Sequence, residues 1–181
     1  MNRINTLTLA TIALLPLAFA LPVDDAAAQQ MQRVSFKTSA ANSKYTQQHV
    51  IDVGDVPGHQ VRVFELFRAY PNDAPMINGV RLVESWSRGL SDYTDTNGPN
   101  TGYTVYVMEG GDKFFVRTAT VAQNNVNPDG SRKAVSTSAG NITGGTGKFA
   151  NIKGFVRTVN VFDAKAGYND SQTEIEYSVA K

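Results

Sequence analysis

A carboxylate among apolar neighbours is the first feature of this sequence that could do chemistry. Two-residue alternation over residues 61–70 predicts a β-strand and places Glu65 on one face together with Val63 and Phe67. The opposite face of this strand would carry Arg62, Phe64, Leu66, Arg68 and Tyr70. Because both faces hold apolar residues, one is expected to line a barrel and the other to pack on a second subunit or a covering segment.

Two interpretations of Glu65 stay open. A carboxylate on an apolar face loses hydration unless a partner compensates it, so Glu65 could belong to a structural ion pair. The arginines available for that pair are Arg88, Arg117 and Arg157. Alternatively, Glu65 lies in a cavity with a raised pKa, where it is a candidate catalytic acid or base, or a polar anchor for a ligand.

Further candidate ligand-binding residues lie on neighbouring predicted strands. The single tryptophan, Trp86, either lines a ligand cavity or belongs to the core or the rim. The candidates for the cavity lining, several of which would equally suit an ordinary β core, are Val63, Phe67, Pro75, Ser85, Trp86, Ser87, Tyr103, Tyr106, Arg117 and Tyr177. Small inward side chains leave space for a cavity. A stripe of such residues consists of Ala134, Ser136, Ser138 and Gly140.

A glycine-rich run over residues 142–154 predicts a tight corner between two strands. It does not match a phosphate-binding loop, because Ile142 stands where that motif needs its first glycine and Phe149 follows the lysine. Glycine supplies backbone conformations and close approaches that other residues do not allow. Phe149 is expected to plug the core beneath the corner. The structural residues of this corner are Gly144, Gly145, Gly147, Phe149 and Gly154.

This run resembles the glycine corner of the allene oxide cyclase and dirigent-protein barrels, which carry Gly-Gly-Thr/Ser-Gly-x-Phe, then a further Gly and a long closing strand. The matching residues here are 144–149, Gly154 and 155–162. The resemblance to allene oxide cyclase covers roughly residues 61–179. Residues 63–66, Val-Phe-Glu-Leu, look like that enzyme's Val-Tyr-Glu-Ile, whose Glu is an active-site carboxylate. Pro75 falls where a cavity proline would sit.

The sequence also departs from allene oxide cyclase at cavity positions. The asparagine two residues after the glutamate is Phe67 here, the serine before the proline is Ala74, and a second asparagine aligns near Ser87. These groups hold a water over the epoxide oxygen in the enzyme, so the resemblance implies the fold and the type of cavity more directly than the reaction. The related barrels are usually trimers, which makes a homotrimer the implied assembly.

Strands separated by turn residues account for nearly all of the chain after residue 28. The predicted strands are residues 34–38, 45–53, 61–70, 80–93, 103–109, 113–121, 133–142, 154–162 and 173–179. Turns such as Pro57-Gly58 and Asn78-Gly79 separate them, and no segment shows a helical period. About eight strands at this spacing indicate a sandwich or a barrel. The resemblance favours a single antiparallel eight-stranded β-barrel, calycin-like and of the allene oxide cyclase type.

Residues 1–28 have the organisation of a cleaved signal peptide. Arg3 gives a positive start, residues 6–21 are apolar, and Ala26-Ala27-Ala28 offers a cleavage site before Gln29; cleavage after Ala20 is an alternative. We therefore expect a bacterial secreted or periplasmic protein with one domain over residues 29–181. The chain has no cysteine, so disulfides do not supply its stability.

Charge and histidine content argue against several other functions. The chain has 17 basic and 16 acidic residues, and this balance does not suit a nucleic-acid surface. No segment after the signal is apolar enough to predict membrane insertion. His49 and His59 are the only histidines, which is few for a metal cluster in a chain without cysteine. We expect neither a metal nor a cofactor.

Three functional hypotheses follow. In the first, the barrel binds a small, mostly apolar molecule whose polar end is fixed by Glu65 and Trp86. In the second, the protein is a cofactor-independent isomerase or cyclase in which Glu65 polarises the substrate or moves a proton. In the third, the barrel is filled and the protein has a structural or envelope interaction role without a ligand. One scaffold hosts many functions, so the fold alone does not choose among them.

Overall fold

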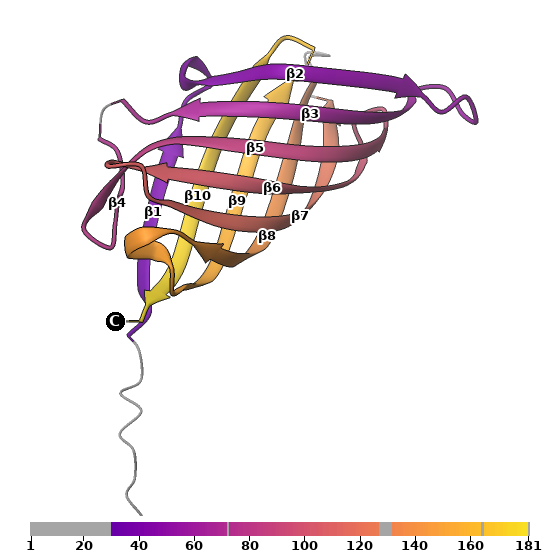
Figure 1. Cartoon of the computed structure of the whole chain (residues 1–181). Helices are drawn as coiled ribbons and strands as arrows, with labels where there is room; N and C mark the ends of the chain where they lie inside the picture. The colour runs from indigo at the N-terminus through magenta and orange to yellow at the C-terminus, as the bar shows by residue number, and fades with distance from the viewer. Residues whose placement is uncertain (1–29, 72, 127–131, 164, 181) are drawn as a thin grey trace, which may run out of the picture.

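The computed structural model describes residues 30–71, 73–126, 132–163 and 165–180. Strands make up almost all of this part of the chain, with two single-turn 3₁₀ helices between them (Figure 1). The elements are β1 (Gln32–Thr38), η1 (Ala40–Asn42), β2 (Ser43–Asp52), β3 (His59–Ala69), β4 (Met76–Ile77), β5 (Val80–Thr94), β6 (Gly98–Met108), β7 (Lys113–Val126), β8 (Arg132–Gly145), η2 (Gly147–Phe149), β9 (Ile152–Asp163) and β10 (Tyr168–Val179). Every strand predicted from alternation is present, so the prediction of an all-β fold is confirmed.

The strand count and the closure of the sheet differ from the prediction. β4 was not predicted, because two residues are too few to show alternation. The antiparallel ladders run in the order β1-β10-β9-β8-β7-β6-β5-β3-β2, and β4 pairs with β5. Among the described residues no ladder joins β1 to β2. The hydrogen-bonded sheet therefore has ten strands and two free edges, instead of eight strands closed into a barrel.

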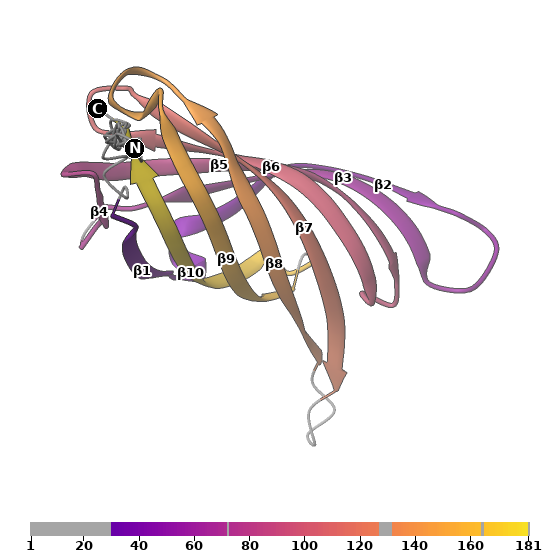
Figure 2. The same cartoon turned by 90° about the horizontal axis from the view of Figure 1, so that it is seen from below.

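The sheet folds over on itself. In Figure 1, β2, β3, β5 and β6 run across the view, while β1, β10, β9 and β8 run steeply and cross them. Figure 2 shows the two halves meeting near β1 and β4 and diverging at the other end, where the β2–β3 connection and the ends of β7 and β8 project in different directions. Register shifts between Leu82 and Glu84, and between Phe115 and Val116, mark β-bulges, which increase the local bend of a strand.

A buried apolar cluster fills the end where the two halves meet, which we call the closed end. Its members are Phe36, Tyr70, Ile77, Leu82, Tyr106, Met108, Phe114, Val116, Ile142, Phe149, Ile152, Val156, Ile175 and Tyr177. A much smaller cluster of Tyr93, Ala122, Ala134 and Phe162 lies toward the diverging, open end. The main apolar core is therefore at one end of the folded sheet.

The glycine corner closes this core as predicted. Phe149, in η2, has no exposed surface and contacts Phe114, with 5.9 Å between the ring centroids. A side chain at Gly145 would place its Cβ 2.4 Å from the carbonyl oxygen of Phe149, and one at Gly154 would place it 2.0 Å from that of Glu176. Gly147 has a φ of 51°, in the left-handed region that favours glycine. These glycines allow the backbone to approach closely enough to seat Phe149.

The predicted signal peptide, residues 1–28, lies outside the described residues. Within the described part of the chain, no helix has the length and apolar character needed to cross a membrane.

Candidate functional site: a polar cavity inside the folded sheet

The inward face of the sheet changes character along each strand. On β8, Ile142 belongs to the closed-end core, Ser138 and Ser136 follow at two-residue spacing, and Ala134 belongs to the small cluster beyond them. The same change occurs on β9, from Val156 through Thr158 and Asn160 to Phe162, and on β7, where it ends at Ala122. On β6 and β10, inward residues of the closed-end core are likewise followed by polar ones. Between the two apolar clusters lies a set of inward polar residues, the polar belt: Ser87, Asn100, Thr104, Thr118, Thr120, Ser136, Ser138, Thr158, Asn160, Asn169 and Thr173.

This polar belt surrounds a cavity of about 90 Å³. Aromatic residues of both halves of the sheet also line it, among them Tyr45, Phe64 and Tyr106. Toward the open end, a groove of about 800 Å³ lies next to the cavity. The cavity and the groove share three lining residues, Arg62, Tyr93 and Phe162, so the two spaces are adjacent. The predicted small-residue stripe contributes Ser136 and Ser138 to the lining.

A buried arginine lies at the centre of this belt. Arg68, on β3, is only 9% exposed. Its Nη2 donates hydrogen bonds to Asn169 Oδ1 at 2.8 Å and to Asn160 Oδ1 at 3.1 Å, and its Nη1 lies 3.5 Å from Ser87 Oγ. Its Nε has no hydrogen-bond partner among the described residues. Arg68 thus links β3 to β9 and β10 across the cavity through neutral groups only.

The two asparagines that accept these hydrogen bonds are themselves oriented by the belt. Asn160 donates from Nδ2 to Ser136 Oγ at 3.0 Å, and Asn169 donates from Nδ2 to the hydroxyl of Tyr45 at 3.3 Å. Their amide oxygens are therefore directed at the guanidinium group. The contact between Asn169 and Tyr45 also joins β10 to β2 where the two have no common ladder. The network places Arg68 firmly and leaves one of its nitrogen donors free.

Two tyrosines, Tyr70 and Tyr106, belong to the closed-end core and also line the cavity. Tyr70 exchanges a hydrogen bond of 3.0 Å with Ser85, and Tyr106 stacks on Phe114 with 4.6 Å between the ring centroids. Burial raises the pKa of both phenols above the ordinary tyrosine value, although the charge of Arg68 opposes this rise. Both are therefore protonated at neutral pH, and they can donate hydrogen bonds but do not act as bases.

For Glu65, the ion-pair interpretation is confirmed. Glu65 Oε2 lies 2.7 Å from Arg88 Nη2, and Thr46 Oγ1 donates a 2.7 Å hydrogen bond to Glu65 Oε1. The hydrogen bond from Thr46 is the largest cause that lowers the pKa of Glu65, and the charge of Arg88 acts in the same direction. The alternative of a raised pKa is therefore wrong, because β3 turns this carboxylate to the outward face, where an arginine compensates it.

Val63, Phe67 and Trp86 share this outward face. Val63 is 51% exposed, and Phe67 packs against Trp86 with 4.8 Å between ring centroids, so none of these side chains lines the cavity. The opposite face of β3, with Phe64, Leu66, Arg68 and Tyr70, forms the lining. The sequence prediction assigned the two faces of this strand the wrong way round.

The other predicted site residues divide between the cavity and its surroundings. Ser87 and Tyr106 line the cavity. Tyr103 borders it, but its side chain is 58% exposed and lies on the outward face, opposite Arg88 in the ladder. Ser85 is buried beside the lining, where it contacts Tyr70. Three further candidates are not among the lining residues that the structure describes: Pro75, Arg117 and Tyr177. Of these three, Tyr177 is buried in the closed-end core, where its hydroxyl donates to Gln32 Oε1 at 2.8 Å.

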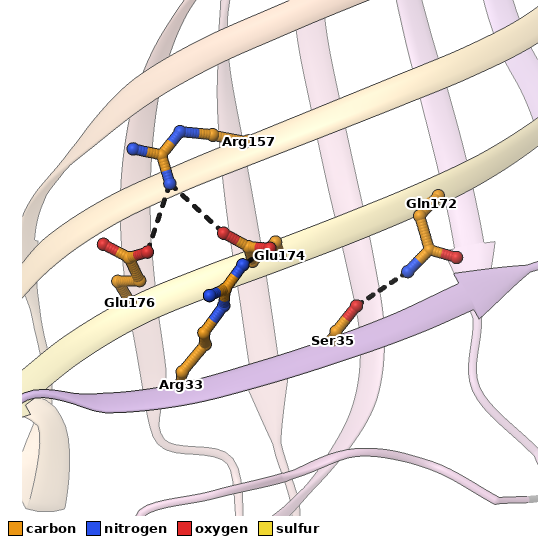
Figure 3. Close-up of polar contacts among 6 residues, drawn as sticks. All are labelled: Arg33, Ser35, Arg157, Gln172, Glu174 and Glu176. Atoms are coloured by element: carbon orange, nitrogen blue, oxygen red, sulfur yellow. Dashed lines mark hydrogen bonds and ion pairs between the residues drawn. The ribbon is translucent and has the colours of Figure 1, made fainter.

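A second group of charged side chains lies on the outward face of β1, β9 and β10 (Figure 3). Arg157 Nη1 is 3.2 Å from both Glu174 Oε1 and Glu176 Oε1, and Arg33 also pairs with Glu174. The hydrogen bond from Arg33 is the main cause that lowers the pKa of Glu174. These arginines are half-exposed and have carboxylate partners, in contrast to Arg68.

The sequence analysis missed Arg68, Asn160 and Asn169 as site residues. A signal for Arg68 was present, because it shares two-residue spacing with Phe64, Leu66 and Tyr70 and is a charge among apolar residues, like Glu65 on the other face. For the two asparagines the sequence carries no comparable signal, since their role depends on the contact between distant strands.

The fold defines an all-β antiparallel protein with a polar cavity inside its sheet. The structure is similar to that of pyocyanin demethylase, with 15% identity and a TM-score of 0.43 over 80% of this chain and 100% of that chain. It is also similar to a pterocarpan synthase dirigent protein, with 10% identity and a TM-score of 0.47 over 84% of this chain and 93% of that one. The second of these structures is of a dirigent protein, one of the two groups that the sequence resembles. No family model and no curated protein sequence matches the chain.

Proposed function

We propose that this protein is a secreted or periplasmic binding protein that holds a small molecule in the cavity inside its folded sheet. In this proposal the sheet wraps the ligand as a barrel would. Enclosing a ligand does not require a hydrogen-bonded ladder between β1 and β2. The contact between Tyr45 and Asn169 already connects β2 with β10.

The polar belt is the observation that carries the proposal. The inward face of a folded sheet normally holds the apolar core, because buried polar groups cost free energy unless they are hydrogen-bonded. Here, small hydroxyl and amide residues replace large apolar ones over several neighbouring strands and leave a cavity of about 90 Å³. This arrangement sacrifices apolar packing at the centre of the fold. A binding site explains that loss, since a ligand can use the volume and the polar groups.

The geometry favours binding over the other two hypotheses. An isomerase would need an acid or base in the cavity, but Glu65 is paired with Arg88 on the outward face, and no Asp or Glu is among the described lining residues. A filled structural barrel would need large apolar side chains where the belt has serine and threonine. The ligand of this cavity also needs more polar groups than the mostly apolar molecule expected from the sequence.

Self-association through the outward face of β3, β5 and β6 is part of the proposal. Val63, Leu90 and Tyr103 on this face are 51%, 46% and 58% exposed, so an apolar surface faces away from the cavity. Burial of such a surface against a second and a third copy would stabilise a trimer.

Native mass spectrometry of the mature protein, purified from its own medium or periplasm, tests the proposal. We expect a protomer mass with a reproducible small-molecule addition, and the same spectrum reports the oligomeric state. Ser138→Phe, which fills the cavity, should abolish the addition. Thr137→Phe, on the exposed face of the same strand, is the matched control and should retain it. Circular dichroism confirms that both variants fold.

The proposal fails if the wild type carries no addition and takes none up from a small-molecule extract. It also fails if Ser138→Phe folds and retains the addition as well as Thr137→Phe does, because the molecule would then bind elsewhere.

A further inference from the structure

We propose that Arg68 binds the anionic group of the cavity's ligand, and that this group is a carboxylate. The inference rests on the proposed function, that the cavity holds a small molecule, and it names the chemical class of that molecule. Among the residues that the structure describes, Arg68 is the one charged side chain that is buried within the polar belt.

Burial makes the charge of Arg68 unusual. An arginine side chain is protonated at every accessible pH, so it cannot avoid burial of its charge by losing a proton. Removing this charge from water is unfavourable unless a compensating charge or a full set of hydrogen bonds replaces the hydration. Arg68 is only 9% exposed and forms no ion pair with any carboxylate of the described residues.

The hydrogen-bond donors of Arg68 are incompletely used. A guanidinium group has five N–H donors in a fixed plane. Nη2 is well satisfied by Asn160 and Asn169, whereas the 3.5 Å distance from Nη1 to Ser87 Oγ is at the limit of a hydrogen bond. The Nε donor has no partner among the described residues. The amides therefore fix one corner of the guanidinium plane and leave the Nε donor, which is itself buried, without an acceptor.

The charge of the lining agrees with an anionic ligand. Arg62 and Arg68 line the cavity, and no acidic residue does so within the described chain. Arg88 also borders the cavity, but its side chain is half-exposed on the outward face. Glu65 compensates Arg88 on the outward side. Arg62, which lies where cavity and groove meet, donates from Nη1 to Gln48 Oε1 at 2.9 Å and lies over the ring of Phe64. The groove lining carries Asp95 and Asp163 as well as Arg62 and Lys165, so the net positive charge of the lining is in the inner cavity, which an anion reaches past Arg62.

A carboxylate fits this site better than other anions. It carries one negative charge, which balances the single buried guanidinium, whereas a phosphate group at neutral pH would bring an excess of negative charge. One of its oxygens can accept a charge-assisted hydrogen bond from the unpartnered Nε donor. A carboxylic acid is ionised at neutral pH without any shift in pKa, but a phenol is not. The inner cavity of about 90 Å³ would hold the carboxylate end, while the groove of about 800 Å³ has room for a larger body.

A purely structural role is the competing explanation. Arg68 connects β3 with β9 and β10, and this link alone would stabilise the folded sheet. The test therefore follows the unpartnered Nε–H donor itself. If Arg68 had only a structural role, the resonance of this donor would not need to change when anions are added.

The experiment is an NMR titration of the ¹⁵N-labelled mature protein that follows the Arg68 Nε–H resonance, assigned by triple-resonance spectra and by its loss in Arg68→Met. Acetate and acetamide are compared first, because they have the same size and differ in charge. Benzoate and benzamide follow. We expect both carboxylates to shift the Arg68 resonance saturably and the amides to leave it in place. Benzoate should bind at least tenfold more tightly than benzamide, since hydrogen bonds to charged groups are stronger than neutral ones.

Arg68→Met should abolish the preference for benzoate, and Arg157→Met, on the charged outward face, should leave it unchanged. The inference is overturned if neither carboxylate shifts the Arg68 resonance, or if the amides shift it as much as the carboxylates do. It is also overturned if inorganic phosphate shifts this resonance and the carboxylates do not. The wild-type titration decides the question even if Arg68→Met does not fold. Benzamide could instead shift the backbone amide resonances of Ser136 and Thr158 while benzoate binds no more tightly than benzamide. The cavity would then bind small molecules, and only the assignment of an anionic ligand would be wrong.

Discussion

The two ends of the folded sheet are built from the same strands but with different inward residues. At the closed end, β6 contributes Tyr106 and Met108, and β7 contributes Phe114 and Val116. A few residues further along these strands, the inward positions hold Thr104 on β6 and Thr118 and Thr120 on β7. The ladder between β6 and β7 continues without a register shift through this change. The strand pairing is therefore shared, while the inward side chains divide the molecule into a packed part and a hollow part.

This difference separates the packed core from the proposed binding cavity along the strand axis. The closed end buries large side chains, which is the dominant favourable contribution to folding. The polar belt buries small hydroxyl groups, which contribute little net stability but hold acceptors and donors at fixed positions. The open end relies on polar contacts of its hairpin and on a small apolar cluster. Substitutions in the three parts should therefore differ in their effects on stability and binding.

The largest expected effect is at the closed end. Phe149→Ala removes a fully buried ring that contacts Phe114, and it should lower the free energy of unfolding by about 3–5 kcal/mol. Phe155→Ala, which removes the same side chain from the half-buried outward face of β9, is the matched control and should cost less than half as much. Equilibrium unfolding in urea measures both. Equal costs would contradict the view that the closed end is the main source of stability.

A smaller effect is expected in the polar belt. Thr120 Oγ1 and Ser138 Oγ form a 2.7 Å hydrogen bond beside the cavity. Ser138→Ala alone leaves the Thr120 hydroxyl without this partner and should cost about 1–2 kcal/mol. The double variant Thr120→Val with Ser138→Ala removes both polar groups and should be within about 1 kcal/mol of the wild type. The same urea titrations check this double-mutant cycle.

If the double variant lost as much stability as Phe149→Ala, the belt would be part of the stabilising core. The distinction between the packed and the hollow part of the sheet would then be lost. The double variant should also weaken retention of the ligand, since it removes two polar groups from the lining.

Much of the fold could be predicted from the sequence, because strand alternation and turn residues are local signals. The glycine corner is the clearest case, since its glycines and Phe149 are close in the chain and their packing follows from their spacing. Closure of the sheet could not be predicted in this way. Whether β1 pairs with β2 depends on the twist and bend accumulated over every strand between them.

The site was harder to predict, for a reason visible on β3. Both faces of this strand combine apolar residues with one or two charges, so alternation alone cannot tell which face turns inward. A comparison of Glu65 with Arg68 across strands would have helped. Glu65 has Arg88 directly opposite in the ladder, whereas Arg68 has Ser85, so only Glu65 finds an opposite charge on a neighbouring strand.

The smallest expected effect is at the open end, where His59 holds the start of β3 to its neighbours. His59 Nδ1 lies 2.6 Å from Asp55 Oδ1 and its Nε2 lies 2.7 Å from Asp92 Oδ1. The hydrogen bond to Asp92, followed by the one to Asp55, raises the pKa of His59 above its usual value of 6.5. The hydrogen bond with His59 in turn is the main cause that lowers the pKa of Asp55 below 3.8.

The sign of the pH dependence follows from these directions. The contribution of His59 is fully present below pH 6.5 and is lost as the pH rises through its raised pKa. The contribution of Asp55 is present above pH 3.8 and is lost as the pH falls through its lowered pKa. The wild type should therefore exceed His59→Gln in thermal stability most clearly between these values, near pH 5, and only marginally at pH 9.

Thermal unfolding midpoints of both proteins at pH 5, 7 and 9 measure this difference. The aspartates are half-exposed, so salt should screen the interaction and reduce the advantage of the wild type at pH 5. A difference that stays constant from pH 5 to pH 9 would mean that His59 acts through packing and not through its charge. The open end would then be stabilised by packing, as the closed end is. The two ends would differ only in how much packing contributes to their stability.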